Sequence, residues 1–272
     1  MALITSITPT VCALLGVDPP SLSDRSYLPE VIEASSTQLS GRIVQRCLIF
    51  APDAMGAWLA AKYPSKFDEV ARHAPLRLRL RSVVPPKTPV CWASVFTGAL
   101  PEMHGIRPVS PRPVFHGDTL FDTMVRAGKR VAIVSVTDSS MDRVFRGREV
   151  DYFAERYDPE VTDCVLNLLE AGTHDIIVAY QQEYDDLMHK TTPEGVEALR
   201  AVDHHVEAFH VIAGAFSKQW RDYDRAIMWL TDHGTHVDAA SGKGTHGDDI
   251  PEDMMVEHFF GFRRADTGIV GN

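Results

Sequence analysis

Cysteines and long hydrophobic runs are both scarce in this chain of 272 residues. The four cysteines lie far apart and form no CxxC pair, which argues against a disulfide framework or a cysteine zinc site and favours a reducing compartment. No apolar run approaches the roughly 20 residues that a membrane-spanning helix needs. The apolar patch at 11–17 has no lysine or arginine before it, unlike a signal peptide. We therefore expect a soluble, cytoplasmic protein with no membrane partner.

Positively charged residues are fewer than negatively charged residues. The chain has 27 lysines and arginines against 37 aspartates and glutamates, a formal net charge of -10. Nucleic acids and anionic membranes would repel such a chain, so neither is expected as a partner. A negatively charged protein can still hold cations. The composition does not indicate an oligomeric state.

The length of 272 residues is long for one domain but short for two, so we expect one domain over residues 1–272. The apolar fraction of 44% suits a packed core, and short apolar runs alternate with helical patterns. This alternation is typical of a three-layer α/β/α sandwich with a mostly parallel central sheet. The predicted strands are 47–51, 76–84, 130–136, 175–180, 226–230 and 256–262.

Capping residues set the expected helix ends. Asp118 is predicted to cap a helix that stops at Gly128, and a second helix runs from 158 to Gly172. The longest helix is expected from Pro193 to about Phe216. Three histidines in that helix, at 204, 205 and 210, are expected to be surface or interface residues, because their spacing does not stack ligands on one face.

Side chains with metal-binding atoms follow several predicted strands. In open parallel sheets, ligands bind in the crevice beyond the carboxyl ends of the strands, where residues from separate strands lie close together. Each such residue alone is usually a turn, a cap or a solvated loop residue. Their convergence from three strands favours a mixed carboxylate and imidazole site instead. The six residues are Asp53, Asp185, His189, Asp232, His233 and, in the glycine-rich loop SGKGTHGDD, His246.

Thr88 precedes Pro89 and is predicted to be the N-cap of a helix that ends near Gly98. A structural cap is the ordinary interpretation of such a threonine. The alternative is a nucleophile, because metal coordination and the positive end of a helix both favour the alkoxide.

Five segments in this order carry a resemblance to a known family. They are FAPDAMG, KTPVCWASVFTGALPEMHGI, EYDDLMHKTTPEG, TDHG and GTHGDD, and they span residues 50–249. Together they resemble the alkaline phosphatase superfamily, most closely its nucleotide pyrophosphatase/phosphodiesterase-like branch. Five ordered segments are far more specific than any single one.

The resemblance implies an alkaline phosphatase-like core and a metal-dependent hydrolase of small-molecule phosphate esters, with Thr88 as nucleophile. It implies two divalent metal ions, most simply zinc, although manganese accepts the same donors. Asp186 is an alternative to Asp185, but the four-residue spacing to His189 favours Asp185. The implied ligands are Asp53, Thr88, Asp232 and His233 for one metal, and Asp185, His189 and His246 for the other.

The chain departs from the family pattern in two ways. Insertions are minimal, since only 12 residues separate His233 from His246, so an open site is expected. The asparagine that diesterase relatives place after the HGI tail is replaced here by Arg107 and the residues after it. Phosphatase and phosphodiesterase activity therefore both remain open. Arg107, Lys87 and Lys243 are candidate substrate contacts, although such side chains are more often simply solvated.

Three other functions compete with hydrolysis. A phosphomutase-type relative uses a similar metal cluster under a cap, for which the short insertions leave no room. A sulfatase requires a C-x-P-x-R segment that this chain lacks. A binding or scaffold protein that lost turnover is the alternative from a different class, and the seven occupied ligand positions argue against it.

Overall fold

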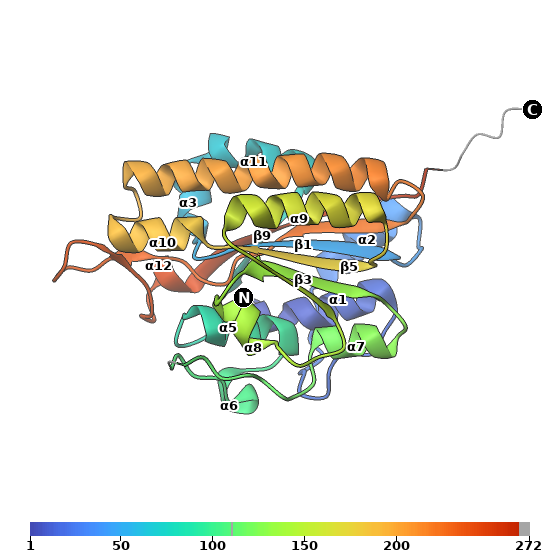
Figure 1. Cartoon of the computed structure of the whole chain (residues 1–272), viewed down its shortest axis with the longest axis horizontal. Helices are drawn as coiled ribbons and strands as arrows, with labels where there is room; N and C mark the ends of the chain where they lie inside the picture. Colours follow the sequence, from blue (N-terminus) through green and yellow to red (C-terminus); the bar gives the residue numbers. More distant parts are fainter. Residues whose placement is uncertain (110, 267–272) are drawn as a thin grey trace, which may run out of the picture.

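A seven-stranded sheet forms the centre of the computed structural model, which describes residues 1–109 and 111–266 (Figure 1). In chain order the strands are β1 (Arg46–Pro52), β2 (Leu76–Arg81), β3 (Val131–Val136), β4 (Asp151–Glu155), β5 (Ile176–Gln181), β6 (Arg225–Trp229) and β9 (Met255–Arg263). Their spatial order is β2-β9-β6-β1-β5-β3-β4. Only β9 runs against the others, so the predicted mostly parallel sheet is confirmed.

Helices cover both faces of the sheet, as Figure 1 shows. One face carries α1 (Ile7–Leu15), α2 (Pro29–Leu39), α5 (Thr88–Thr97), α7 (Leu120–Arg126) and α8 (Ser140–Val144). The other carries α3 (Ala57–Lys62), α4 (Asp68–His73), α9 (Asp158–Ala171), α10 (Glu183–Lys190) and α11 (Val196–Gln219). The short elements are η1 (Ile4–Ser6), η2 (Pro64–Phe67), α6 (Pro101–His104), α12 (Pro251–Met254) and the hairpin β7 (His236–Val237) with β8 (Gly244–Thr245).

Strand β1 shows why the core has two halves. Every residue of β1 is buried. Because side chains alternate along a strand, Cys47 and Ile49 pack with the α5 face, whereas Leu48 and Phe50 pack with the α11 face. A strand covered on both sides is continuously apolar, which matches the predicted three layers.

Some predicted boundaries were wrong for local reasons. Strand β4 was missed because it lies at the sheet edge and contains only exposed and half-buried residues, which leaves little apolar pattern. The cap of α7 is Thr119, which forms a capping box with Asp122, whereas Asp118 accepts a hydrogen bond from the Ser21 amide. The longest helix begins at Val196, after Gly195.

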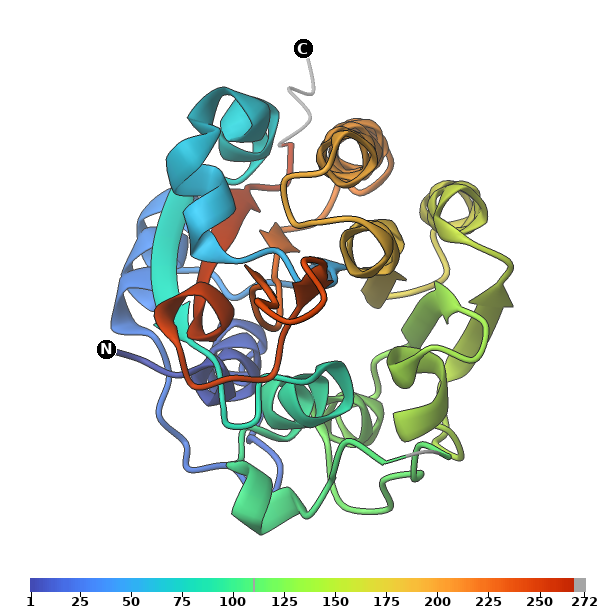
Figure 2. The same ribbon diagram turned by 90° about the vertical axis from the view of Figure 1, so that its left-hand side faces the viewer.

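The parallel strands place their carboxyl ends along one rim of the sheet. Helix α10 follows β5 at this rim, and α12 lies at the same end (Figure 1), the side that faces the viewer in Figure 2. Because β9 is antiparallel, it begins at the rim where its neighbours end. The loop before β9 therefore meets the loops after β1, β5 and β6.

Among the described residues, the helices include none with the length and apolar character needed to span a bilayer. A single domain over residues 1–272 stays a prediction, and its last six residues lie outside the described part of the chain.

Candidate active site

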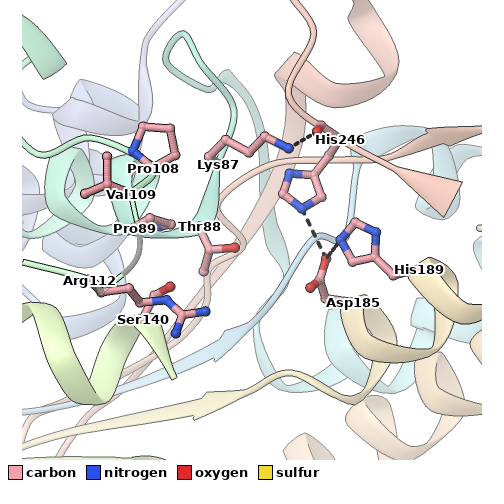
Figure 3. Close-up of a pocket in the computed structure, with 10 residues that line it drawn as sticks. All are labelled: Lys87, Thr88, Pro89, Pro108, Val109, Arg112, Ser140, Asp185, His189 and His246. Carbon is pink, nitrogen blue, oxygen red and sulfur yellow. Dashed lines mark hydrogen bonds and ion pairs between the residues drawn. The ribbon is translucent and has the colours of Figure 1, made fainter. Parts of the chain in front are cut away.

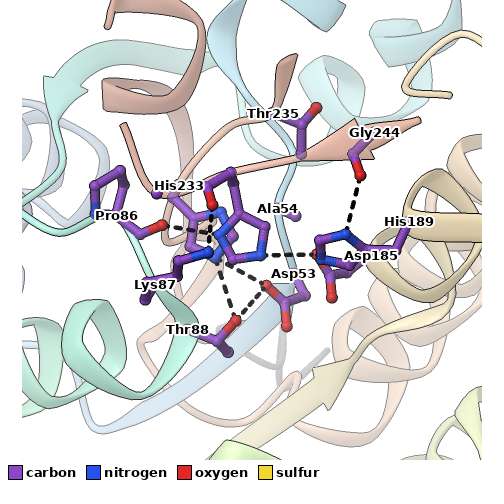
Figure 4. Close-up of polar contacts among 12 residues, drawn as sticks. Asp53, Ala54, Pro86, Lys87, Thr88, Asp185, His189, His233, Thr235 and Gly244 are labelled. Atoms are coloured by element: carbon purple, nitrogen blue, oxygen red, sulfur yellow. Dashed lines mark hydrogen bonds and ion pairs between the residues drawn. The ribbon is translucent and has the colours of Figure 1, made fainter. Parts of the chain in front are cut away.

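The first group of rim residues surrounds the Thr88 hydroxyl. Thr88 Oγ1 lies 3.4 Å from Asp53 Oδ1 and 3.2 Å from His233 Nε2. His233 Nε2 is also 3.3 Å from Asp232 Oδ2. Asp53 follows β1, and Asp232 and His233 follow β6, so two neighbouring strands and the start of α5 build this group. Figure 4 shows Thr88, Asp53 and His233 together. Asp53, Asp232 and His233 have donor atoms close enough to share one metal ion, and we call these three residues the first donor set.

The second group lies on and beside α10. His189 Nε2 and His246 Nε2 lie 3.4 and 3.5 Å from the same atom, Asp185 Oδ1 (Figure 3). Asp185 and His189 are four residues apart on α10 and therefore share one helix face. The neighbouring Asp186 instead accepts a hydrogen bond from Tyr157 at 2.8 Å. Asp185, His189 and His246 form the second donor set.

The two sets adjoin each other. The imidazole rings of His233 and His246 are stacked, with centroids 4.0 Å apart. The rings of His189 and His246 have centroids 5.0 Å apart. The structure thus brings all six strand-end residues, and Thr88, to one place at the rim.

Backbone carbonyls hold the three imidazoles in one tautomer. A carbonyl oxygen can only accept, so each Nδ1 must carry the proton and each Nε2 presents a lone pair to the carboxylates. Metal-binding histidines are oriented in this way. The contacts are His233 to Gly234 at 3.1 Å, His189 to Gly244 at 3.1 Å and His246 to Pro86 at 2.9 Å.

Burial and mutual repulsion disfavour charge on the carboxyl groups. Burial, and then the charge of Asp232, raises the pKa of Asp185 to about 8. The same two causes, burial first and a neighbouring carboxylate second, raise the pKa values of Asp53 and Asp232 well above the usual range. Burial lowers the pKa of His233 to about 3. Neutral imidazoles beside crowded carboxylates form a site that a cation would stabilise.

Two buried oxygens support this interpretation. Asp185 Oδ1 and Asp232 Oδ2 have no hydrogen-bond partner among the described residues. Unpartnered buried carboxylate oxygens are costly, and a metal ion satisfies them directly. One of these atoms belongs to each donor set, so the residues fit two cations.

Tyr180 is a site residue that the sequence did not reveal. Its buried hydroxyl, at the end of β5, donates a hydrogen bond to Asp53 Oδ2. The other carboxylate oxygen, Asp53 Oδ1, contacts Thr88 and His233. A tyrosine in a buried strand has no local signal that distinguishes this role from ordinary packing.

Asp158 holds the start of α10. Its carboxylate oxygens accept hydrogen bonds from the Gln182 and Glu183 amides at 3.0 and 2.9 Å. Asp158 is buried at the start of α9, so it joins the two helices. Because α10 carries Asp185 and His189, the contact fixes the orientation of the second donor set.

His205 supports the same turn from α11. Its Nε2 accepts from the Tyr184 amide at 3.2 Å, while its Nδ1–H donates to Gln181 at 3.0 Å. The expectation of a surface or interface position was wrong for His205, which is fully buried within the chain. Helical spacing cannot reveal that its partners lie at the end of β5 and in the first turn of α10.

A pocket of about 430 Å³ opens above Thr88. Figure 3 shows the Thr88 hydroxyl between Asp185 with its imidazoles on one side and Arg112 with Ser140 on the other. Arg112 and Ser140 were not predicted. The lining residues are Lys87, Thr88, Pro89, Pro108, Val109, Arg112, Ser140, Asp185, His189 and His246.

The three predicted substrate contacts have different positions. Lys87 lines the pocket, and its ammonium group donates to the His246 carbonyl. Lys243 is exposed on the β7–β8 turn. The Arg107 guanidinium donates to the carbonyls of Pro101 and Ile106 at 3.0 and 3.1 Å. Within the described residues neither Arg107 nor Lys243 lines the pocket, because their own turns direct them elsewhere.

The predicted capping role of Thr88 was wrong. Thr88 is the first residue of α5, and Lys87 is its N-cap. The Thr88 hydroxyl makes no cap hydrogen bond and instead faces Asp53 and His233. A threonine at a helix start whose hydroxyl faces acids and an imidazole is available for chemistry.

Solved structures share this fold. Phosphonoacetate hydrolase from Sinorhizobium meliloti 1021, in complex with phosphonoformate, is similar with a TM-score of 0.52 and 19% identity over 75% of this chain and 61% of that chain. Human ectonucleotide pyrophosphatase/phosphodiesterase 5 is similar with a TM-score of 0.54 and 13% identity over 71% and 57%. A 2-O GAG sulfatase is similar with a TM-score of 0.58 and 13% identity over 80% and 64%. The chain thus spans less than two thirds of each relative.

Among curated proteins, none matches the chain by sequence. The sequence model of the type I phosphodiesterase/nucleotide pyrophosphatase family matches residues 48–237. This range covers more than half of the chain and includes Asp53, Thr88, Asp185 and Asp232. The protein belongs to the type I phosphodiesterase/nucleotide pyrophosphatase family.

Proposed function

We propose that the chain is a metal-dependent hydrolase of small-molecule phosphoric esters in which Thr88 is the nucleophile. One observation carries the proposal: the Thr88 hydroxyl lies 3.4 Å from Asp53 and 3.2 Å from His233 and opens into the pocket that the second donor set also lines. A hydroxyl beside two groups of carboxylates and neutral imidazoles has the surroundings that activate it. Membership of the family supports the same reaction class.

Each donor set fits one divalent ion. The first would use Asp53, Asp232 and His233 together with the Thr88 oxygen, and the second would use Asp185, His189 and His246. Nitrogen and oxygen donors in this mixture suit zinc, and manganese accepts them as well. When bound, such ions supply Lewis acidity, which polarises phosphoryl oxygens and lowers the pKa of a bound hydroxyl.

Thr88 would attack phosphorus and form an Oγ1–P bond. The Thr88 hydroxyl loses its proton as this bond forms, and the P–O bond to the leaving group breaks. The departing alkoxide or phenolate takes up one proton, which balances the proton that the hydroxyl lost. Water then hydrolyses the phosphothreonine, which releases the phosphate product and restores the hydroxyl. The start of α5 favours the negative charge that collects here, because a helix N-terminus carries partial positive charge.

Lys87 and Arg112 are proposed to contact the phosphate. Lys87 lies directly before Thr88 and lines the pocket. The Arg112 guanidinium donates to the Asp138 carbonyl at 3.0 Å through Nη1, and its other N–H groups can serve an anion. Pro108 and Val109 give the pocket an apolar wall, against which a second ester group of a diester could pack.

A direct test combines metal analysis with nitrophenyl mono- and diester assays of the wild type and Thr88→Ala. The proposal predicts bound metal in both proteins and turnover in the wild type alone. Equal turnover in the variant would show that Thr88 is not the nucleophile. A metal-loaded wild type without turnover would favour a binding or scaffold role, and transfer of phosphate to an acceptor without release would favour a phosphomutase.

We also propose a cytoplasmic location. All four cysteines are free, although Cys12, Cys47 and Cys91 are buried. Fractionation of the native cells, with a thiol assay of the recovered protein, tests this location. Recovery from the medium or from a membrane fraction would contradict it.

A further inference from the structure

Three side chains that carry potential metal-donor atoms meet outside the rim. Glu69 and His73 lie four residues apart on α4, and His210 faces them from α11. We call these residues the α4–α11 cluster. His210 Nδ1 lies 3.0 Å from His73 Nε2 and 3.1 Å from Glu69 Oε2. The cluster shares no residue with either rim donor set.

Protons alone do not satisfy this arrangement. In either tautomer His210 Nδ1 can form one good hydrogen bond, through its proton or through its lone pair, yet two polar atoms lie within 3.1 Å of it. Glu69 Oε2 is buried and has no hydrogen-bond partner among the residues that the structure describes. An orphaned buried carboxylate oxygen beside two imidazole nitrogens is the observation that points to a ligand.

The spacing of the donor atoms suits a tetrahedral ion. Donors about 2.0–2.1 Å from zinc at tetrahedral angles lie roughly 3.3 Å from one another. The contacts of 3.0 and 3.1 Å are close to this value, and all three donor atoms lie within 4.8 Å of one another. Two imidazoles and one carboxylate leave a fourth position for water.

The surroundings hold the cluster in place but leave it accessible. Arg72 pairs with the other Glu69 oxygen, Oε1, at 2.9 Å, so Oε2 keeps its direction. The His73 ring packs edge-on against Phe209, with ring centroids 6.3 Å apart. The side chains of Glu69 and His210 are 34% and 41% exposed, so an ion can enter from solvent.

We infer that Glu69, His73 and His210 form a third divalent-cation site, suited to zinc, which joins α4 to α11. An ion there satisfies all three donor atoms and adds a cross-link between two helices that cover the same face of the sheet. The site would connect two helices and has no part in catalysis. It therefore does not depend on the proposed function.

The test measures the zinc stoichiometry of the 272-residue chain. Calorimetric titration with zinc should show one equivalent fewer for His73→Gln/His210→Gln than for the wild type. Zinc should also raise the unfolding temperature more in the wild type than in this variant. His204→Gln is the matched control, because His204 lies on the same helix outside the cluster, and it should keep every equivalent.

A rim-disabled background separates this site from the active site. In Asp53→Asn/His189→Gln the α4–α11 cluster should still bind one zinc, and adding His210→Gln should abolish that binding. Unchanged stoichiometry on adding His210→Gln would overturn the inference. Ester hydrolysis by the His210→Gln single variant should equal that of the wild type. Loss of the third site therefore changes zinc stoichiometry without changing activity, whereas a defect in the rim donor sets changes activity.

Discussion

The Nδ1–H group of His246 donates a hydrogen bond of 2.9 Å to the carbonyl oxygen of Pro86. Pro86 precedes Thr88 by two residues, so the segment that presents the hydroxyl also orients an imidazole of the second donor set. Lys87, between them, donates back to the His246 carbonyl. Two segments separated by 160 positions in the sequence therefore hold each other in register around the pocket.

Thr88→Ala should lower kcat on a nitrophenyl ester by roughly 10³-fold or more, because the attacking oxygen is removed. Thr88→Ser keeps a hydroxyl and should retain part of the activity. Steady-state kinetics and circular dichroism would distinguish lost chemistry from lost folding. A Thr88→Ala protein with near-normal kcat refutes the assignment.

Chelation should abolish turnover, and zinc or manganese should restore it, because the six donor side chains act through bound ions. The metal-free chain should also unfold at a lower temperature, since ions that bind only the folded state stabilise it. Scanning calorimetry with and without chelator measures this shift. Full activity in a preparation shown to be free of metal would exclude the mechanism.

Asp158→Ala should weaken metal binding at the second donor set. The Gln182 and Glu183 amides would lose their acceptors, at a cost of about 1–3 kcal/mol, and α10 would lose its anchor. We expect roughly tenfold lower affinity for the second ion, measured by competition with a chelator. Glu160→Gln on the same helix is the control and should leave affinity unchanged, while Asp158→Asn should be milder.

His205 should make the protein sensitive to acid. Burial lowers the pKa of His205 from 6.5 to about 3. Below pH 6.5 the unfolded chain binds a proton that the native chain does not. The contribution of His205 to the free energy of unfolding is therefore fully present above pH 6.5 and is lost progressively as the pH falls toward 3. This residue contributes a slope of about 1.4 kcal/mol per pH unit. Denaturant unfolding of metal-free protein at several pH values should show a shallower slope for His205→Gln; an identical slope would contradict the assignment.

Gly234→Ala should destabilise the fold by roughly 1–3 kcal/mol. A Cβ atom at Gly234 would lie 2.0 Å from the Glu252 carbonyl oxygen, so the β6 and α12 segments would have to separate. Gly214→Ala is the matched control: nothing lies within 4 Å of its Cβ position in α11, and alanine there should stabilise by about 0.5–1 kcal/mol. Chemical denaturation of both variants should give changes of opposite sign.

The sequence predicted the sheet, its layers and the residues that gather at the rim, because strand burial and strand-end position are local properties. The loops were harder. Arg107 and Lys243 appeared suitable by proximity in sequence, but turn geometry directs them away from the pocket, while Arg112 reaches it across a longer loop. Tyr180 and Asp158 act through partners on other elements, and one sequence carries no periodicity that reports such pairings.

The late position of β9 in the chain affects how the sheet assembles. During synthesis every other strand of the sheet is made before β9, yet β9 belongs between β2 and β6. Until β9 inserts, a nascent chain therefore has an unpaired strand edge on β6. His246 lies in the loop that leads into β9. Binding of an ion at the second donor set therefore indicates that β9 has paired with β6.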